Sequence, residues 1–254
     1  VLRLPASGQI KAGGIALVLD ASDPLVKQRP VQWAAEQLRE ALKVRGVATQ
    51  SFAQLDQAAP DCELILVGSR GSALGRQVLE SAGAAVPDKP EALGLVRGKV
   101  GTRSVLLACG SDVRGLVYSL LELADRATYS AAPLAALGRI ERIVEQPANP
   151  IRSIARLFTS EVEDKPWFYD KAFWQRYLTM LATQRFNRFN LTLGLGYNAP
   201  RNVPDSYFYF AYPFLLSVPG YNVTARGLPD EERDRNLAML RWISDETASR
   251  GLHF

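Results

Sequence analysis

Apolar runs alternate with segments of helical periodicity along the first part of the chain. Strands are predicted where the apolar runs fall, at residues 15–20, 47–52, 63–67, 93–100 and 103–108. Between the first two runs, a helix is predicted from Pro30 to Gly46, because apolar residues recur there at helical spacing. Further helices are expected up to Leu79 and directly after Asp112, which has N-cap character.

A change of pattern marks the end of this first part. Residues 99–102 separate two strand-like runs, which indicates a β-hairpin. Residues 138–145 alternate apolar and charged side chains, as an edge strand with one exposed face does. Two prolines within 146–150 then predict a short, stiff connection. We therefore expect residues 1–148 to form a small α/β domain of their own.

The pattern after the connection is that of repeated β-α-β units. Strands are predicted at 151–158 and 189–196, and Asp170 is expected to cap a helix between them. A long loop over about 197–228 follows the second of these strands.

The last helix is predicted from Pro229 to Gly251, with acidic residues in its first turn. Its buried side is expected to consist of Leu237, Leu240, Ile243 and Thr247. Residues 252–254 have the character of the first residues of a third strand.

These alternating elements predict the fold class α/β, with a small mixed-sheet α/β sandwich domain followed by a truncated (β/α)8 TIM barrel. Residues 149–254 would supply only the first two or so units of the barrel. A complete barrel needs about 250 residues, whereas 104 residues follow Pro150 (254 − 150). Because an open parallel half-sheet exposes apolar surface, we expect the biological polypeptide to be longer than this chain.

Composition and charge exclude several classes of function. The 30 basic and 26 acidic residues are spread along the chain without a Lys/Arg block, so no nucleic-acid partner is expected. No apolar stretch is long enough for a membrane span, so no membrane association is expected. A single histidine, His253, argues against histidine-rich metal sites, and neither a metal nor a cofactor is expected. Cys62 and Cys109 are predicted to be buried thiols, with one disulfide left open if the protein is exported.

Candidate site residues are sought at the C-terminal ends of the predicted barrel strands, because the active sites of barrel enzymes lie there. The first strand is followed by acidic residues, of which Glu161 and Asp164 could accept hydrogen bonds from sugar hydroxyls. The alternative is a solvated loop that caps the next helix. Arg156, in the middle of that strand, could contact a ligand or pair with a carboxylate of the barrel.

The long loop after the second predicted strand is rich in aromatic residues. Tyr197 and Asn198 follow the strand directly, and Tyr207 and Tyr209 belong to the aromatic stretch 205–221. Aromatic faces suit the apolar C–H faces of sugar rings, and tyrosine hydroxyls add hydrogen bonds. These residues are candidates for carbohydrate binding, and packing of the loop onto its own domain is the alternative.

Several segments resemble a known group of enzymes. RSVLLACGSDVRGLVYSLLELAD (103–125), ELILVGSRGS (63–72) and NPIRSIARLF (149–158) are similar to the small α/β domain and barrel entrance of β-N-acetylhexosaminidases and α-glucuronidases. WFYDKAFWQRYLTMLATQRFNRFNLTLG (167–194) resembles their first barrel helix and second strand. The resemblance implies that Arg152 contacts sugar hydroxyls, and a structural role is the alternative. It also implies that the catalytic acids lie on later strands.

The chain is therefore expected to be the N-terminal portion of a glycoside hydrolase that acts on oligo- or polysaccharide, with no catalytic residue of its own. The expected partners are carbohydrate and the remainder of the barrel after Phe254. A non-catalytic carbohydrate-binding or interaction protein with a degenerate barrel is the first alternative. A nucleotide-binding regulatory domain is a weaker one, because the turn at 67–72 lacks the spacing of a phosphate-binding loop.

Overall fold

The computed structural model describes residues 14–59, 62–158, 161–193, 214–221 and 228–254. The chain divides into two compact units, residues 1–150 and 151–254, each of which is described by itself.

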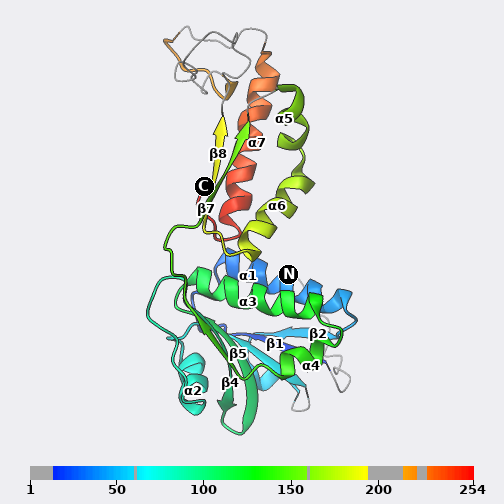
Figure 1. Ribbon diagram of the computed structural model, residues 1–254, viewed down its shortest axis with the longest axis vertical. Helices are drawn as coiled ribbons and strands as arrows, with labels where there is room; N and C mark the ends of the chain where they lie inside the picture. The colour runs from blue at the N-terminus through cyan, green and yellow to red at the C-terminus, as the bar shows by residue number, and fades with distance from the viewer. Residues whose placement is uncertain (1–13, 60–61, 159–160, 194–213, 222–227) are drawn as a thin grey trace. The chain divides into compact units, whose positions relative to one another are not determined.

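The described residues of the first unit form a six-stranded sheet in the order β2-β1-β3-β5-β4-β6 (Figure 1). Its strands are β1 (Ile15–Leu19), β2 (Thr49–Phe52), β3 (Glu63–Val67), β4 (Leu93–Val100), β5 (Arg103–Gly110) and β6 (Arg142–Glu145). β1 pairs in parallel with β2 and β3, and β3 with β5, whereas β4 is antiparallel to both of its neighbours. The predicted hairpin is therefore confirmed, and the predicted edge strand is confirmed over Arg142–Glu145, the second half of the expected segment 138–145.

Helices cover both faces of this sheet. The unit contains α1 (Arg29–Val44), α2 (Ala73–Ser81), α3 (Val113–Tyr129), α4 (Pro133–Gly138) and a 3₁₀ turn at Leu55–Gln57. α1 and α3 pack together on one face, while α2 lies on the other (Figure 1). The predicted helices are confirmed; α4 escaped prediction because six residues are too short to show a helical period.

The amphipathic pattern of α1 explains why this segment folds as a helix against the sheet. Pro30 stands in its first turn, where a missing N–H costs nothing. The side chains that face the core recur every three or four residues, and they are Val31, Ala34, Ala35, Leu38 and Leu42. Gly46 has a positive φ of 71°, which glycine adopts without strain, and the chain turns there into β2.

The second unit contains two parallel strands and three helices among its described residues. The elements are β7 (Ser153–Phe158), α5 (Glu161–Phe168), α6 (Lys171–Thr183), β8 (Arg188–Leu193) and α7 (Asp230–Ala248). β7 and β8 pair from Ser153↔Arg188 to Phe158↔Leu193. His253 adds a parallel bridge to Arg188, which agrees with the start of a third strand at 252–254.

The core of this unit is rich in aromatic rings. The side chains at its centre are Phe158, Phe168, Trp174, Leu178, Leu181, Phe189, Met239, Ile243 and Leu252. Trp174 is fully buried, and its indole N–H donates to the carbonyl oxygen of Phe168 at 2.8 Å. This bond satisfies the polar end of a large ring inside an apolar core.

Two predictions for this unit need correction. Residues 161–168 form the short helix α5 instead of a solvated loop; with Pro166 inside it, the segment shows no apolar period. On α7 the buried line is Met239, Ile243 and Thr247, spaced by four residues, whereas Leu237 and Leu240 are only half-buried. The buried stripe of α7 is therefore rotated slightly around the helix axis relative to the predicted stripe.

Candidate functional site

The two faces of the β7–β8 pair differ in chemistry. Ile154 and Phe158 of β7 and Phe189 and Leu191 of β8 belong to the core on the helix side. Ser153, Ala155 and Leu157 alternate with the core residues of β7, and all three are exposed. Because successive side chains of a strand point to opposite faces, these residues define an open face of the sheet.

Polar side chains of β8 complete the open face. Asn190 and Thr192 are exposed, and they pair in register with Ala155 and Leu157. The Asn190 side-chain amide donates to the Ser153 hydroxyl at 2.8 Å. The sequence interpretation did not select Asn190 or Thr192 as site residues, although their alternation with Phe189 and Leu191 was visible.

Near the C-terminal end of β7, helices α5 and α7 are joined by polar contacts. The Lys165 ammonium group forms an ion pair with the Glu232 carboxylate, and both side chains are largely buried. The carboxylate of Asp164 accepts a hydrogen bond from the indole N–H of Trp167 at 2.8 Å. Asp164 is thus engaged within its own helix.

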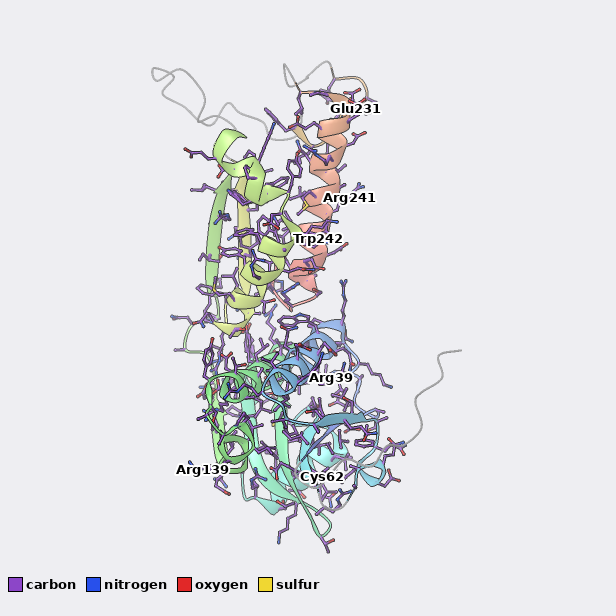
Figure 2. All side chains as sticks on the ribbon, turned by 90° about the vertical axis from the view of Figure 1, so that its right-hand side faces the viewer. Arg39, Cys62, Arg139, Glu231, Arg241 and Trp242 are labelled. Atoms are coloured by element: carbon purple, nitrogen blue, oxygen red, sulfur yellow. The ribbon has the colours of Figure 1, made fainter. Side chains whose placement is uncertain are left out.

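A second set of contacts ties α7 to the described part of the aromatic stretch. The Asn236 amide donates to the carbonyl oxygen of Phe214 at 3.1 Å, and its oxygen accepts a hydrogen bond from the Tyr169 hydroxyl. The guanidinium of Arg235 lies 4.1 Å from the centre of the Tyr169 ring, and the ammonium group of Lys171 lies 5.2 Å from that of Trp242. Trp242 is labelled on α7 in Figure 2. Phe214 also helps to close a cavity of about 30 Å³, roughly room for one water molecule.

Arg156 lies on the helix side of β7 and faces aromatic rings. Its guanidinium carbon is 4.0 Å from the centre of the Trp167 ring and 4.9 Å from that of Phe173. Its Nε is buried and has no hydrogen-bond partner among the described residues. Burial raises the pKa of the nearby Tyr177 hydroxyl, and the positive charge of Arg156 partly opposes that rise. Among the described residues the guanidinium group of Arg156 therefore stacks on aromatic rings, and its expected contact with a ligand or a barrel carboxylate stays a prediction.

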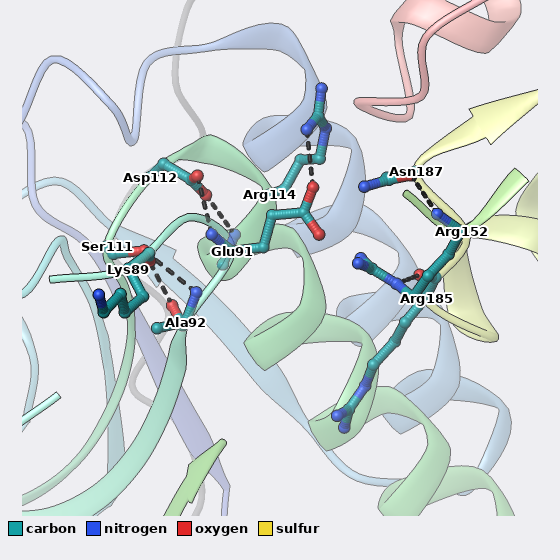
Figure 3. Close-up of polar contacts among 10 residues, drawn as sticks. Lys89, Glu91, Ala92, Ser111, Asp112, Arg114, Arg152, Arg185 and Asn187 are labelled. Carbon is teal, nitrogen blue, oxygen red and sulfur yellow. Dashed lines mark hydrogen bonds and ion pairs between the residues drawn. The ribbon is translucent and has the colours of Figure 1, made fainter. Parts of the chain in front are cut away.

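Arg152 lies at the opposite end of β7 from the strand ends just described. Its backbone N–H donates to the Asn187 side-chain oxygen at 2.9 Å, and its Nε donates to the carbonyl oxygen of Arg185 at 2.6 Å (Figure 3). These bonds hold the turn between α6 and β8. These contacts are those of a structural residue, and the predicted contact of Arg152 with sugar hydroxyls stays a prediction.

Five of the predicted site residues lie wholly or partly outside the residues that the structure describes. Tyr197, Asn198, Tyr207 and Tyr209 lie outside the described residues. Glu161 begins α5, and its side chain is likewise outside the described part.

In the first unit, Asp112 caps the start of α3, as the sequence predicted, and Arg114 lies in the first turn of the same helix. The Asp112 carboxylate accepts hydrogen bonds from the backbone N–H groups of Gly115, at 2.8 Å, and Glu91, at 2.9 Å. Arg114 pairs with the buried Glu91 carboxylate at 2.7 Å (Figure 3). Glu91 has a positive φ of 63°, and these contacts hold that uncommon conformation in place.

The described part of the second unit offers a surface for binding more readily than a catalytic centre. Glycoside hydrolysis needs two carboxyl groups that flank the scissile bond. Among the described residues near the strand ends, Asp164 and Glu232 are engaged by Trp167 and Lys165. No three metal-binding side chains gather in the described part of the chain. None of the described helices is long and apolar enough to cross a membrane.

Comparison with known proteins gives fold similarity without sequence similarity. No protein-family model matches the chain, and no curated protein matches it in sequence. Among solved structures, a GH138 enzyme targeting pectin rhamnogalacturonan II superimposes with a TM-score of 0.64 at 18% identity. The match covers 94% of this chain and 30% of that chain.

A second similar structure is a family GH115 4-O-methyl-α-glucuronidase with specificity for decorated arabinogalactans. Its TM-score is 0.50 at 19% identity, over 72% of this chain and 26% of that one. This chain thus spans less than a third of the length of either enzyme. The chain has an α/β fold that it shares with glycoside hydrolases.

Proposed function

We propose that this chain is the N-terminal portion of a glycoside hydrolase that acts on oligo- or polysaccharide. In this proposal residues 1–148 are the accessory α/β domain, and residues 149–254 supply the first units of a TIM barrel. The observation that carries the proposal is the fold shared with the GH138 enzyme over 94% of this chain. The parallel β7–β8 pair, with helices on one face only among the described residues, is consistent with it.

The open face of β7 and β8 would then point into the barrel. The interior of such a barrel is filled by layers of side chains, each layer coming from alternate strands. Leu157 and Thr192 lie on adjacent strands, so they would belong to different layers. His253 would begin the third strand. The remaining strands and the two catalytic carboxyl groups would come from residues beyond this chain.

The finer assignment within the glycoside hydrolases is an α-glucuronidase or β-N-acetylhexosaminidase type. The segments quoted above resemble both, and the similarity to the GH115 enzyme supports the α-glucuronidase type. Plant polysaccharides that carry uronic acids are the first substrates to test, because the two similar enzymes act on pectin and on decorated arabinogalactans.

The test is hydrolysis by a longer protein that contains residues 1–254. Rhamnogalacturonan II fragments and aryl glycosides of glucuronic acid and N-acetylhexosamine are the substrates, and the 254-residue chain is assayed beside it. We expect turnover by the longer protein and none by the chain. Absence of turnover on every substrate, by a folded longer protein, would reject the glycosidase proposal. Hydrolysis by the chain alone would contradict the placement of the catalytic acids.

A pair of variants sharpens this test. Thr192→Arg places a long charged side chain on the open face of β8, so it should abolish turnover if that face lines the barrel. Gln175→Arg places the same side chain on the exposed side of α6 and should leave turnover unchanged.

The alternative is a non-catalytic carbohydrate-binding protein with a degenerate barrel. The engagement of Asp164 and Glu232 by neighbouring side chains agrees with both functions, because neither assigns these two residues to catalysis. Saturable binding of the same oligosaccharides by the longer protein, without release of product, would select it.

A further inference from the structure

A cavity of about 500 Å³ lies beside the C-terminal ends of β1 and β2 in the first unit. Its volume falls within the range of about 300–1,000 Å³ that is usual for small-molecule sites. Hydrogen-bonding groups line one part of it, contributed by Asp20, Ser22, Asp56 and Arg103. Leu55 and Leu74 supply apolar wall.

The position of the cavity follows from the topology of the sheet. From β1 the chain passes through α1 to β2 on one side, whereas from β3 it passes through α2 toward β5 and β4 on the other. The two connections therefore leave in opposite directions at the adjacent strands β1 and β3 (Figure 1). In open α/β sheets ligands bind outside the carboxyl ends of the strands at such a switch point.

Asp20 is the first residue after β1, and it is only 3% exposed. One carboxylate oxygen, Oδ1, accepts hydrogen bonds from the backbone N–H of Ser22 at 3.0 Å and from its hydroxyl at 2.6 Å. The other, Oδ2, has no hydrogen-bond partner among the described residues. Because a buried carboxylate oxygen without a donor is costly, it favours a ligand that brings an O–H or N–H group.

The glycine-containing turn after β3 is not free to bind an anion. The carboxylate of Asp23 accepts a hydrogen bond from the backbone N–H of Ser69. The hydroxyl of Ser72 caps α2 by accepting from the N–H of Gly75 at 3.0 Å. The backbone N–H groups of Ser69 and Gly75 are therefore already used and do not bind a phosphate group. Asp20 and Asp56 bring two negative charges to the lining against the one positive charge of Arg103, and this balance opposes an anionic ligand.

Arg103 holds one wall of the cavity in place. Its two terminal nitrogens donate to the carbonyl oxygens of Leu55, at 2.8 Å, and Ala59, at 2.7 Å. These bonds fix the segment that carries Leu55 and Asp56. Leu55 and Leu74 pack against the core beneath the cavity, so its apolar wall is anchored as well.

We propose that this cavity is a binding site for a neutral polyhydroxyl ligand, of the size of a mono- or disaccharide. Hydroxyl groups of the ligand would donate to the acceptor-rich side formed by Asp20 and Asp56. Its C–H groups would contact Leu55 and Leu74. The site lies entirely within the first unit and is separate from the proposed barrel, so it does not depend on glycosidase activity.

The experiment is a titration of the ¹⁵N-labelled 254-residue chain, followed by NMR. D-galactose, L-rhamnose, D-glucose and N-acetyl-D-glucosamine are the probes, each taken into the millimolar range. D-glucuronate, phosphate and Ca²⁺ are the competing chemical classes. We expect at least one neutral sugar to shift the amide signals of Ala21, Ser22 and Gly68 in a saturable way.

Variants connect the shifts to the cavity. Asp20→Asn removes the charge without changing the shape, so it should weaken binding by about tenfold or more. Asp88→Asn alters an exposed carboxylate outside the cavity lining, paired with Arg70, and should leave the affinity unchanged. If Asp20→Asn fails to fold, Leu74→Trp tests the same site by filling the cavity, and binding should again be lost.

Three outcomes would overturn the proposal. The first is that no neutral sugar shifts these amide signals. The second is that phosphate or Ca²⁺ alone shifts them. The third is that a folded Asp20→Asn or Leu74→Trp variant binds the sugar as tightly as the unmodified chain.

Discussion

Cys109 is a completely buried thiol on β5, and burial raises its pKa from 9.0 to about 12. The positive charge of Arg70 and a backbone hydrogen bond from Gly94 oppose this rise but are smaller. Because the folded-state pKa lies above the unfolded one, the thiol contributes stability that is complete below about pH 9 and is lost as the pH rises toward 12. Cys62 is half-buried, so only Cys109 fully matches the prediction of buried thiols.

This shift predicts a pH-dependent difference between the chain and its Cys109→Ala variant. The free energy of unfolding of the chain, relative to the variant, should fall by about 1.4 kcal/mol between pH 8 and pH 10. Urea unfolding at both pH values measures it. Cys62→Ala, at the half-buried thiol, serves as the control. A relative stability that stays constant or rises with pH would contradict the burial of Cys109.

Asn187 predicts a second effect at the residue scale. Asn187 is buried. Its side-chain oxygen accepts a hydrogen bond from the backbone N–H of Arg152, and its backbone carbonyl oxygen accepts one from the backbone N–H of His253 at 2.9 Å. Asn187→Ala leaves the Arg152 N–H without this acceptor, so it should lower the free energy of unfolding by about 1–3 kcal/mol. Asn190→Ala, on the open face, should change it by less than about 0.5 kcal/mol. Equal losses in chemical unfolding would refute the role of Asn187.

Some contacts of single residues could be predicted from the sequence and others could not. The capping role of Asp112 follows from its place before a helix, so it was predictable. The stacking of Arg156 on Trp167 was not, because it depends on which face of β7 meets the helices. The same holds for Asp164, whose partner Trp167 is revealed only when α5 is seen to be a helix.

At the scale of elements, α3 lies close to the loop that precedes β4. A Cβ atom on Gly115 would lie 2.2 Å from the carbonyl oxygen of Ala92, whereas one on Gly138 of α4 would meet nothing within 4 Å. Both glycines are helical. Gly115→Ala must therefore displace backbone, but Gly138→Ala gains helix propensity without a clash.

These two glycines form a matched pair of tests. Gly115→Ala should lower the free energy of unfolding by more than about 2 kcal/mol. Gly138→Ala should leave it unchanged or raise it by up to about 1 kcal/mol. Thermal and urea unfolding measure both. Tolerance of alanine at Gly115 would mean that α3 does not approach Ala92 as closely as described.

Elements with a strong period were predictable from the sequence, but their arrangement was not. β1, β3, α1 and α3 carry apolar patterns that local rules interpret correctly. The hairpin of β4 and β5 was predictable because the two strands are neighbours in the chain. The order of β2, β1 and β3 depends on contacts between distant segments, and so does the cavity beside them.

At the scale of the whole molecule, Leu157 distinguishes an open sheet from a closed barrel. It lies on the open face and is 56% exposed. Leu157→Lys should therefore change the stability of the 254-residue chain by less than about 0.5 kcal/mol. In a longer protein with a closed barrel, the same variant buries a charge and should cost about 3 kcal/mol or more. Equal effects in the two proteins would argue against closure.

An experimental structure of a longer protein that contains this chain is the most direct test of whether β7 and β8 are the first strands of a parallel barrel. The proposal predicts that β8 pairs in parallel with a strand that begins at His253. It also predicts that the free edge of β7 pairs in parallel with the last strand of the barrel. A β7 edge that stays unpaired, or an antiparallel partner on either side, would contradict the proposal.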